Sequence, residues 1–273
     1  MAKCKPVWIG ALVVAAVLVA CGVAWYSIPK PPAGRVTACT IDHICYCVAR
    51  SLEDSIDKDV AVVRADIRSA RTQGKAIGYL SVPLSSVGGA YFKLNAAFAK
   101  DMKDRLEKRL GPADAWVLDP GEAKYSLPHG ATGADYMLVW TKVLEGETGL
   151  GEDFDFVYFV GPSDFAQYLS LGSSGTLAAL DTLYDGLAKT DPNVARIKKE
   201  DFRDYYGLRA SVSFSLGSHD EWNVVETINE RRRKSALYGI PKQLSVFFDG
   251  RAIAPGVYED TVADGDAGAC RRD

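Results

Sequence analysis

The densest group of ionisable side chains in the sequence is Gly217-Ser218-His219-Asp220-Glu221, which we expect at the end of a strand candidate at 208–216. A histidine beside carboxylates can act as a general acid or base near neutral pH, because the negative charge stabilises its imidazolium form. The same residues could simply open the helix expected at 221–235, with one of them as its N-cap. His219 is therefore a candidate catalytic residue whose alternative role is structural.

Asp164 is the second candidate acid or base. It lies in Gly161-Pro162-Ser163-Asp164, which follows a strand candidate at 155–162. Pro162 would end that strand, and Ser163 or Asp164 could cap the next helix. A capping aspartate at this position can still face a pocket, so both roles stay open.

Small and polar residues also follow the strand candidates at 76–82 and 115–120. In an open parallel sheet, ligands bind at the carboxyl ends of the strands. The segment SSVGGAYF (85–92) leads into a helix whose free N–H groups could hold an anion, but it matches neither the G-x-G-x-x-G pattern nor the P-loop. We predict that the following residues contact a ligand: Ser81, Ser85, Ser86, Gly88, Gly89, Asp119, Gly161 and Ser163.

The elements that must position these residues alternate between strands and helices. Continuous apolar strands separated by helices predict an α/β fold, with a mostly parallel sheet of about five strands covered by helices on both faces. The expected strands are 76–82, 115–120, 155–162, 208–216 and 243–250, and the expected helices are 91–110, 133–146, two between 163 and 189, and 221–235. Helical spacing of apolar residues from Thr40 to Thr72 predicts one or two further helices before the sheet.

The segment GYLSVPLS (78–85) resembles the first strand and loop of nucleoside 2-deoxyribosyltransferase-like proteins, through Tyr79, Leu80, Pro83 and Leu84. The resemblance covers eight residues. It implies an α/β fold in which this loop faces a nucleoside, and a nucleophilic glutamate near a later Gly-Thr pair. Here Gly-Thr occurs at 175–176, but the following helix supplies Asp181 in place of a glutamate.

The N-terminus predicts a membrane anchor. Residues 6–28 contain no charge, and 23 residues in a helix cover the ~30 Å apolar core of a bilayer. Lys3 and Lys5 favour a cytoplasmic N-terminus (1–5), which puts the remaining chain on the periplasmic or extracellular side of the cytoplasmic membrane. The predicted organisation continues with a Pro-rich linker at 29–38, an exported α/β domain at 39–258 and a flexible tail at 259–273.

Two processing alternatives compete with an uncleaved anchor. Leu18-Val19-Ala20-Cys21 resembles the lipobox of bacterial lipoproteins, which makes Cys21 a candidate lipidation site. Val36-Thr37-Ala38 has the small-residue form of an ordinary signal cleavage site.

Four cysteines lie in the predicted exported part, where oxidising conditions permit disulfides. These are Cys39, Cys45, Cys47 and Cys270, and their even number suits two bridges. Cys45 and Cys47 are too close for an easy mutual bridge, so Cys39 and Cys270 are the more plausible partners. The segment CTIDHICYC (39–47) also contains metal-ligating atoms, but it lacks the C-x-x-C spacing of zinc sites, and we predict no metal.

Charge excludes one class of partner and leaves others open. The formal charge is −3, with 32 basic and 35 acidic residues distributed along the chain, so no nucleic acid is expected. Two functions remain: an enzyme acting on a small polar ligand such as a nucleoside or a sugar phosphate, or a non-catalytic binding or structural protein of the cell envelope. The helical segment before the sheet is also a candidate homodimer interface.

Overall fold

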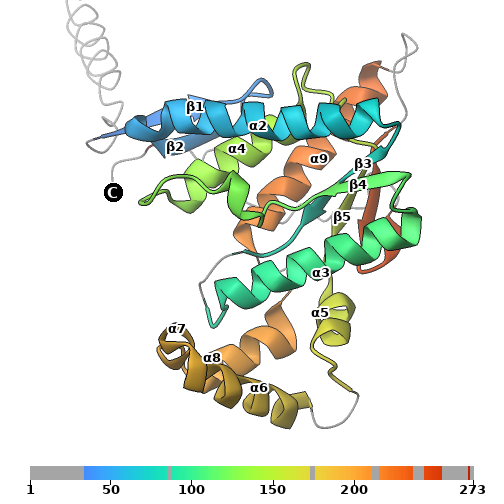
Figure 1. The fold of residues 1–273 in the computed structure, drawn as a ribbon. Helices are drawn as coiled ribbons and strands as arrows, with labels where there is room; N and C mark the ends of the chain where they lie inside the picture. Colours follow the sequence, from blue (N-terminus) through green and yellow to red (C-terminus); the bar gives the residue numbers. More distant parts are fainter. Residues whose placement is uncertain are drawn as a thin grey trace, which may run out of the picture.

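The computed structural model describes residues 34–84, 88–172, 176–210, 215–235, 243–253 and Cys270. They form an α/β domain around a five-stranded sheet with the order β4-β3-β5-β6-β7 (Figure 1). The strands are β3 (Ala76–Ser81), β4 (Ala115–Leu118), β5 (Phe156–Phe159), β6 (Ser245–Phe248) and β7 (Arg251–Ile253). The first four are mutually parallel and β7 is antiparallel to β6, so the predicted α/β class and mostly parallel sheet are confirmed.

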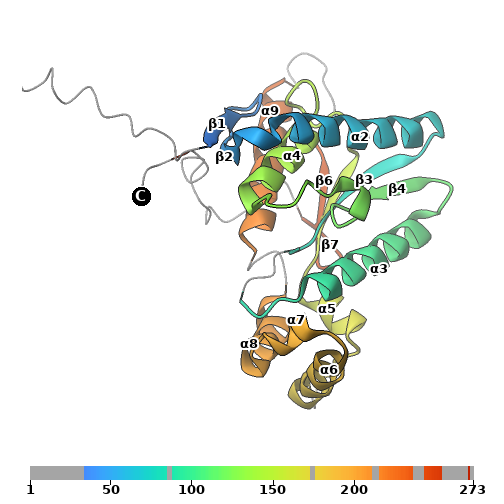
Figure 2. The ribbon, with the colours of Figure 1, turned by 60° about the vertical axis from the view of Figure 1, so that its left-hand side comes forward.

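Helices cover both faces of this sheet, as the two ribbon views show (Figures 1 and 2). One face carries α2 (Glu53–Thr72), α4 (Gly133–Glu145) and α9 (Leu216–Ser235). The other carries α3 (Phe92–Leu110) and the short α5 (Pro162–Tyr168). Central strands β3 and β5 are almost wholly buried, which is why their sequences are continuously apolar instead of alternating.

The segment before α2 corrects one prediction. Residues 35–49 form an antiparallel hairpin of β1 (Arg35–Cys39) and β2 (Cys45–Ala49), and not the start of a helix. Tyr46 and Val48 are buried and alternate with half-buried neighbours, a period of two that a helix cannot satisfy. The second half of the predicted helical segment is confirmed as α2, whose stripe at Ile56, Val60, Val63 and Ile67 is buried within the domain.

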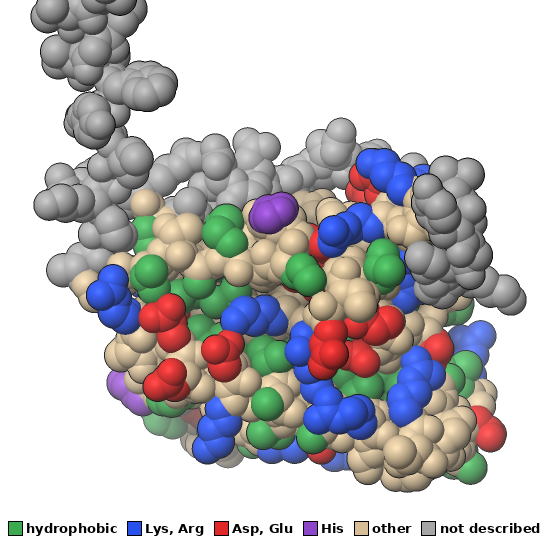
Figure 3. Space-filling model, turned by 90° about the horizontal axis from the view of Figure 1, so that it is seen from above, with side chains coloured by type: hydrophobic (Ala, Val, Ile, Leu, Met, Phe, Trp, Pro, Cys, Tyr) green, Lys and Arg blue, Asp and Glu red, His purple; other side chains and the backbone are tan. Residues whose placement is uncertain are grey.

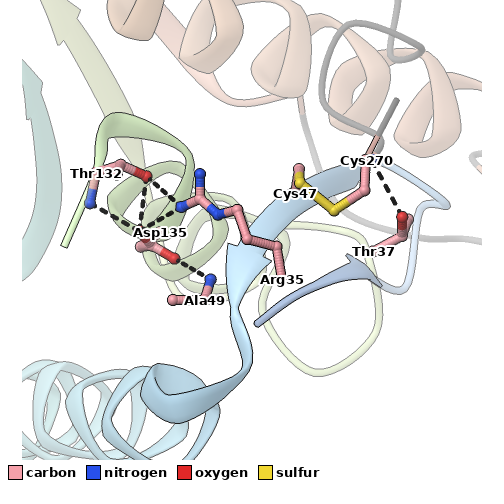
Figure 4. Close-up of a disulfide and its surroundings, with 7 residues drawn as sticks. All are labelled: Arg35, Thr37, Cys47, Ala49, Thr132, Asp135 and Cys270. Carbon is pink, nitrogen blue, oxygen red and sulfur yellow. Dashed lines mark hydrogen bonds and ion pairs between the residues drawn. A yellow bond between two sulfur atoms is a disulfide. The ribbon is translucent and has the colours of Figure 1, made fainter. Parts of the chain in front are cut away.

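The hairpin is attached to α4 by a buried carboxylate (Figure 4). Asp135 accepts hydrogen bonds from the Ala49 N–H at 2.7 Å and from the Thr132 N–H at 2.7 Å, and it pairs with Arg35 at 3.2 Å. These partners hold the pKa of Asp135 below its usual value despite its burial. The first residues of α4 are therefore both capped and joined to the hairpin.

The fourth predicted strand, 208–216, is also wrong where the structure describes it. Tyr205–Arg209 is a π-helical turn, residues 211–214 lie outside the described residues, and α9 begins at Leu216. Ser215 opens that helix, because its hydroxyl accepts the Ser218 N–H and its carbonyl accepts the His219 N–H. The helix starts five residues before the predicted position, and the fifth described strand of the sheet is β7, at the edge beside β6.

A small helical group between β5 and α9 forms what we call the cap lobe, residues 176–210. It contains α6 (Thr176–Thr190), α7 (Pro192–Ala195), α8 (Lys199–Asp204) and the π-helical turn. In both ribbon views it lies beyond α3 and α5 on the side away from α2 (Figures 1 and 2).

The predicted anchor at 6–28 and Cys21 lie outside the described residues, as does all of the predicted tail except Cys270. Among the helices that the structure describes, none combines the length and apolarity needed to cross a bilayer.

Two disulfides join the four cysteines of the domain. Cys39 is bonded to Cys45, its direct partner across the hairpin. Cys47 is bonded to Cys270, 223 residues away in the sequence (Figure 4). The Cys270 N–H also donates to the Thr37 hydroxyl at 3.1 Å. The C-terminal part of the chain is thus attached to β2.

We expect the longer disulfide to contribute more to the free energy of unfolding than the shorter one. In the chain-entropy account, closing a loop of 223 residues stabilises by about 5 kcal/mol, and closing one of six residues by about 2 kcal/mol. Urea denaturation of the double variants Cys47→Ser/Cys270→Ser and Cys39→Ser/Cys45→Ser measures both. An equal or larger loss from the second pair would contradict this prediction.

Candidate functional site

The candidate site lies at the end of the sheet where β3, β4, β5 and β6 all terminate, which we call the carboxyl edge. The chain passes from β3 to its neighbour β4 and then crosses to β5 on the other side of β3. The reversal of direction falls between β3 and β5, and doubly wound sheets bind ligands at the strand ends beside such a reversal.

A buried carboxyl group lies beneath the end of β3. The Glu221 side chain of α9 accepts a hydrogen bond from the Tyr79 hydroxyl and one from the Ser81 hydroxyl, each at 2.5 Å. Tyr79 and Ser81 are fully buried and Glu221 is 5% exposed. Residues two apart in a strand point to the same face, so β3 presents both hydroxyls to α9.

Burial raises the pKa of Glu221 from 4.5 to about 7, because the charged form loses its solvation. The two hydroxyl donors oppose this effect, and the negative charge of Asp220 adds to it. A carboxyl group with a pKa near neutrality exchanges a proton readily at physiological pH, as an acid–base group must.

Helix geometry explains why Glu221 points inward. Val224, Val225 and Ile228 lie three, four and seven residues after it and are buried in the core. Sequence reasoning placed Glu221 at the boundary between a loop and the helix expected at 221–235 and selected His219, so it missed this role. The signal was present: a glutamate on the apolar stripe of a helix, with Tyr79 and Ser81 at alternate positions of a buried strand.

His219 lies in the first turn of α9 and not in a loop after a strand, which corrects its predicted setting. It is half-buried and adjacent to Asp220. Burial raises the pKa of Asp220 to about 6, and the His219 charge acts in the opposite direction. The predicted histidine–carboxylate group therefore stands on a helix, with its third member, Glu221, turned toward β3.

The loop after β3 is attached to the cap lobe. The Asn95 amide is fully buried, donates to the Pro83 carbonyl and to the Tyr205 hydroxyl, and accepts from the Tyr206 hydroxyl. Gly89 has a positive φ of 97°, and a Cβ there would lie 2.0 Å from the Asp201 carbonyl oxygen of α8. Contact with the cap lobe therefore explains this glycine without a ligand.

Of the other residues predicted in this loop, the structure describes Gly88 but not the two serines. Gly88 has a positive φ of 68° and open space around it. Ser85 and Ser86 lie outside the described residues.

Asp119 is buried at the end of β4. Its side chain accepts the Gly121 N–H at 2.7 Å, and burial raises its pKa to about 6. A Cβ on Gly121 would lie 3.0 Å from the Asp119 carboxylate and 3.3 Å from Leu84, so the loops after β3 and β4 are in contact.

The GPSDF segment acts as a helix cap. Asp164 accepts the Gly161 N–H at 2.9 Å and the Tyr158 hydroxyl at 3.0 Å, and burial raises its pKa. Asp249, from the β6–β7 turn, accepts from the Ser163 N–H and hydroxyl and from the Asp164 N–H. A Cβ on Gly161 would lie 2.3 Å from Asp249, so that glycine permits the contact. The structure therefore gives Gly161, Ser163 and Asp164 structural partners, both within the segment and in the β6–β7 turn.

A cavity of about 290 Å³ lies between α5 and the cap lobe. None of the ten described residues that line it is charged. Phe165 and Tyr206 supply aromatic walls, and Ser163 and Thr176 supply hydroxyls. This volume is near the lower limit of small-molecule pockets and suits an uncharged group of one ring system.

Within the described residues, no group of three His, Cys, Asp or Glu side chains could hold a metal ion. Comparison of the chain with known protein families, with curated proteins and with solved structures gives no match.

The raised pKa of Glu221 predicts a particular dependence of stability on pH. Its pKa is about 7 in the folded state and about 4.5 in the unfolded state, so the folded protein binds the proton more tightly. The stability that folding gains from this tighter proton binding is fully present below pH 4.5. It is lost as the pH rises to 7, and the free energy of unfolding falls by about 3 kcal/mol over that range.

Glu221→Gln cannot titrate, so its stability relative to the parent should rise between pH 4.5 and 7 and stay constant above that. Urea denaturation across this range measures the difference, with the exposed Glu53→Gln as the control. A difference that does not vary with pH would show that Glu221 is ionised normally.

Proposed function

We propose that the protein is an enzyme of the cell envelope that acts on a small uncharged polar ligand at the carboxyl edge, with Glu221 as its acid–base group. The observation that carries this proposal is the carboxyl group of Glu221, held by the hydroxyls of Tyr79 and Ser81. A buried polar group of this kind contributes little to stability compared with an apolar side chain of the same size. Perturbed carboxyl groups at strand ends are instead typical of functional sites.

The charge of the carboxyl edge favours a neutral ligand. Asp119, Asp164, Asp220 and Glu221 all lie at or near this end of the sheet, and each has a raised pKa. Bringing a phosphate close to these acids would be repulsive, and the described residues that line the cavity beside the cap lobe offer it no cation. Of the two predicted ligand classes, a nucleoside therefore fits better than a sugar phosphate.

An exported, membrane-attached location is part of the same proposal. The uncharged segment 6–28 supports an anchor in the cytoplasmic membrane, and two disulfides in the domain suit an oxidising compartment. In that arrangement residues 29–33 separate the anchor from the first described residues of the domain.

Ligand screening of the full-length protein in detergent tests the proposal. We expect nucleosides to raise the melting temperature and the corresponding nucleoside monophosphates to leave it unchanged, because the edge is acidic. Chromatography of the incubated nucleosides then detects turnover. The rate should change around pH 7, and Glu221→Gln should retain binding and lose about 100-fold or more in rate.

Glu145→Gln is the matched control, since Glu145 is also a buried helical glutamate bonded to a hydroxyl, but it lies beside the β1–β2 hairpin. Equal losses in both variants, or no response to any nucleoside, would favour the alternative of a non-catalytic envelope protein.

A further inference from the structure

A larger cavity, of about 530 Å³, lies where α2 and α4 meet the β1–β2 turn. Its walls are the β1–β2 turn, the middle of α2 and the C-terminal end of α4, and none of its described lining residues belongs to the carboxyl edge. Ile41, Val60 and Ala61 give it apolar surface, and three cations line it: Arg64, Arg68 and Lys142.

The Arg64 guanidinium is fixed in place but only partly neutralised. One of its terminal nitrogens donates to the carbonyls of Lys142 at 3.1 Å and Gly146 at 2.7 Å, at the C-terminal end of α4. Its Nε is buried and has no hydrogen bond within the described residues. Its other terminal nitrogen lies 3.9 Å from Glu147, too far for a hydrogen bond.

Arg68 lies one helical turn further along α2, on the same side as Arg64. It is exposed and makes no ion pair with any residue that the structure describes. Lys142, by contrast, is paired with Asp57 at 2.7 Å. Two arginines four residues apart therefore line one cavity. The Arg68 guanidinium and the terminal nitrogen of Arg64 nearest Glu147 make no hydrogen bond with the described residues, so they have donors for a ligand.

The glutamates that line this cavity do not hydrogen-bond to the guanidinium groups of Arg64 and Arg68. Glu145 is occupied, because it accepts from the Thr40 hydroxyl at 2.5 Å and from the Ile41 N–H at 3.2 Å. Glu147 is the loose partner of Arg64 and its side chain is 72% exposed. An anion entering the cavity would compete with Glu147 for Arg64, and the Asp153 carboxylate also interacts electrostatically with that arginine.

We propose that this cavity is a binding site for a small oxyanion, a carboxylate or phosphate group on a soluble molecule, held by Arg64 and Arg68. Paired arginines suit the bidentate geometry of such groups. The wider face around α2 carries basic and acidic side chains in mixed groups (Figure 3), which favours a single small anion over an extended anionic surface such as a membrane.

Calorimetric titration of the full-length protein with succinate or inorganic phosphate, at constant ionic strength set with chloride, tests the site. We expect saturable binding that Arg68→Gln weakens about tenfold, since it removes a charge-assisted contact. Glu147→Gln should instead tighten binding about threefold, because it removes the competing carboxylate. These opposite effects cannot both arise from loss of folding.

Arg109→Gln is the matched control, since Arg109 is an exposed arginine on α3 without an ion pair among the described residues. It should leave the affinity unchanged. Absence of binding, or equal effects of Arg68→Gln and Arg109→Gln, would overturn the proposal. Binding only to vesicles of anionic lipid, and not to succinate or phosphate, would also overturn it.

Discussion

The arrangement of the carboxyl edge depends on keeping one carboxyl group beneath the end of the central strand. Glu221 lies between α9 and β3, where water is excluded, so its hydrogen bonds must come from the protein. Tyr79 and Ser81 supply them from alternate positions of β3. That requirement fixes the rotation of α9 about its axis and accounts for a serine and a tyrosine in an otherwise apolar strand.

The same principle applies on the outer side of the helices. At the two ends of α4, Asp135 and Glu145 receive hydrogen bonds from backbone N–H groups and hydroxyls of the β1–β2 hairpin and its turn. Buried acids thus join the hairpin to the domain, and the disulfide from Cys47 joins the C-terminal part of the chain to the hairpin. The hairpin is the point where both ends of the described chain meet (Figure 4).

Contacts with the cap lobe and with the β6–β7 turn give structural roles to some of the residues predicted to contact a ligand. Gly89 was one of these predictions, and it and Asn95, which was not, attach the loop after β3 to Tyr205, Tyr206 and α8. Asp249 similarly occupies the N–H groups at the start of α5. A loop at a strand end can therefore be rich in small and polar residues for structural reasons, and the proposed site moves to Glu221 and to the uncharged cavity beside the lobe.

The sequence by itself determined the α/β class, the strands β3, β4, β5 and β6, and helices α2, α3, α4 and α6, because apolar periodicity records which faces are buried. It did not determine the hairpin at 35–49, where a period of two and a helical spacing fit the same few apolar residues. Only the tertiary structure decided which polar groups meet. Glu221 and Ser81 are 140 residues apart, and no local pattern records a hydrogen bond over that separation. The sequence around Gly161 and Asp164 suits either a helix cap or a ligand site. The hydrogen bond to Asp249, 85 residues away, shows that the segment caps α5.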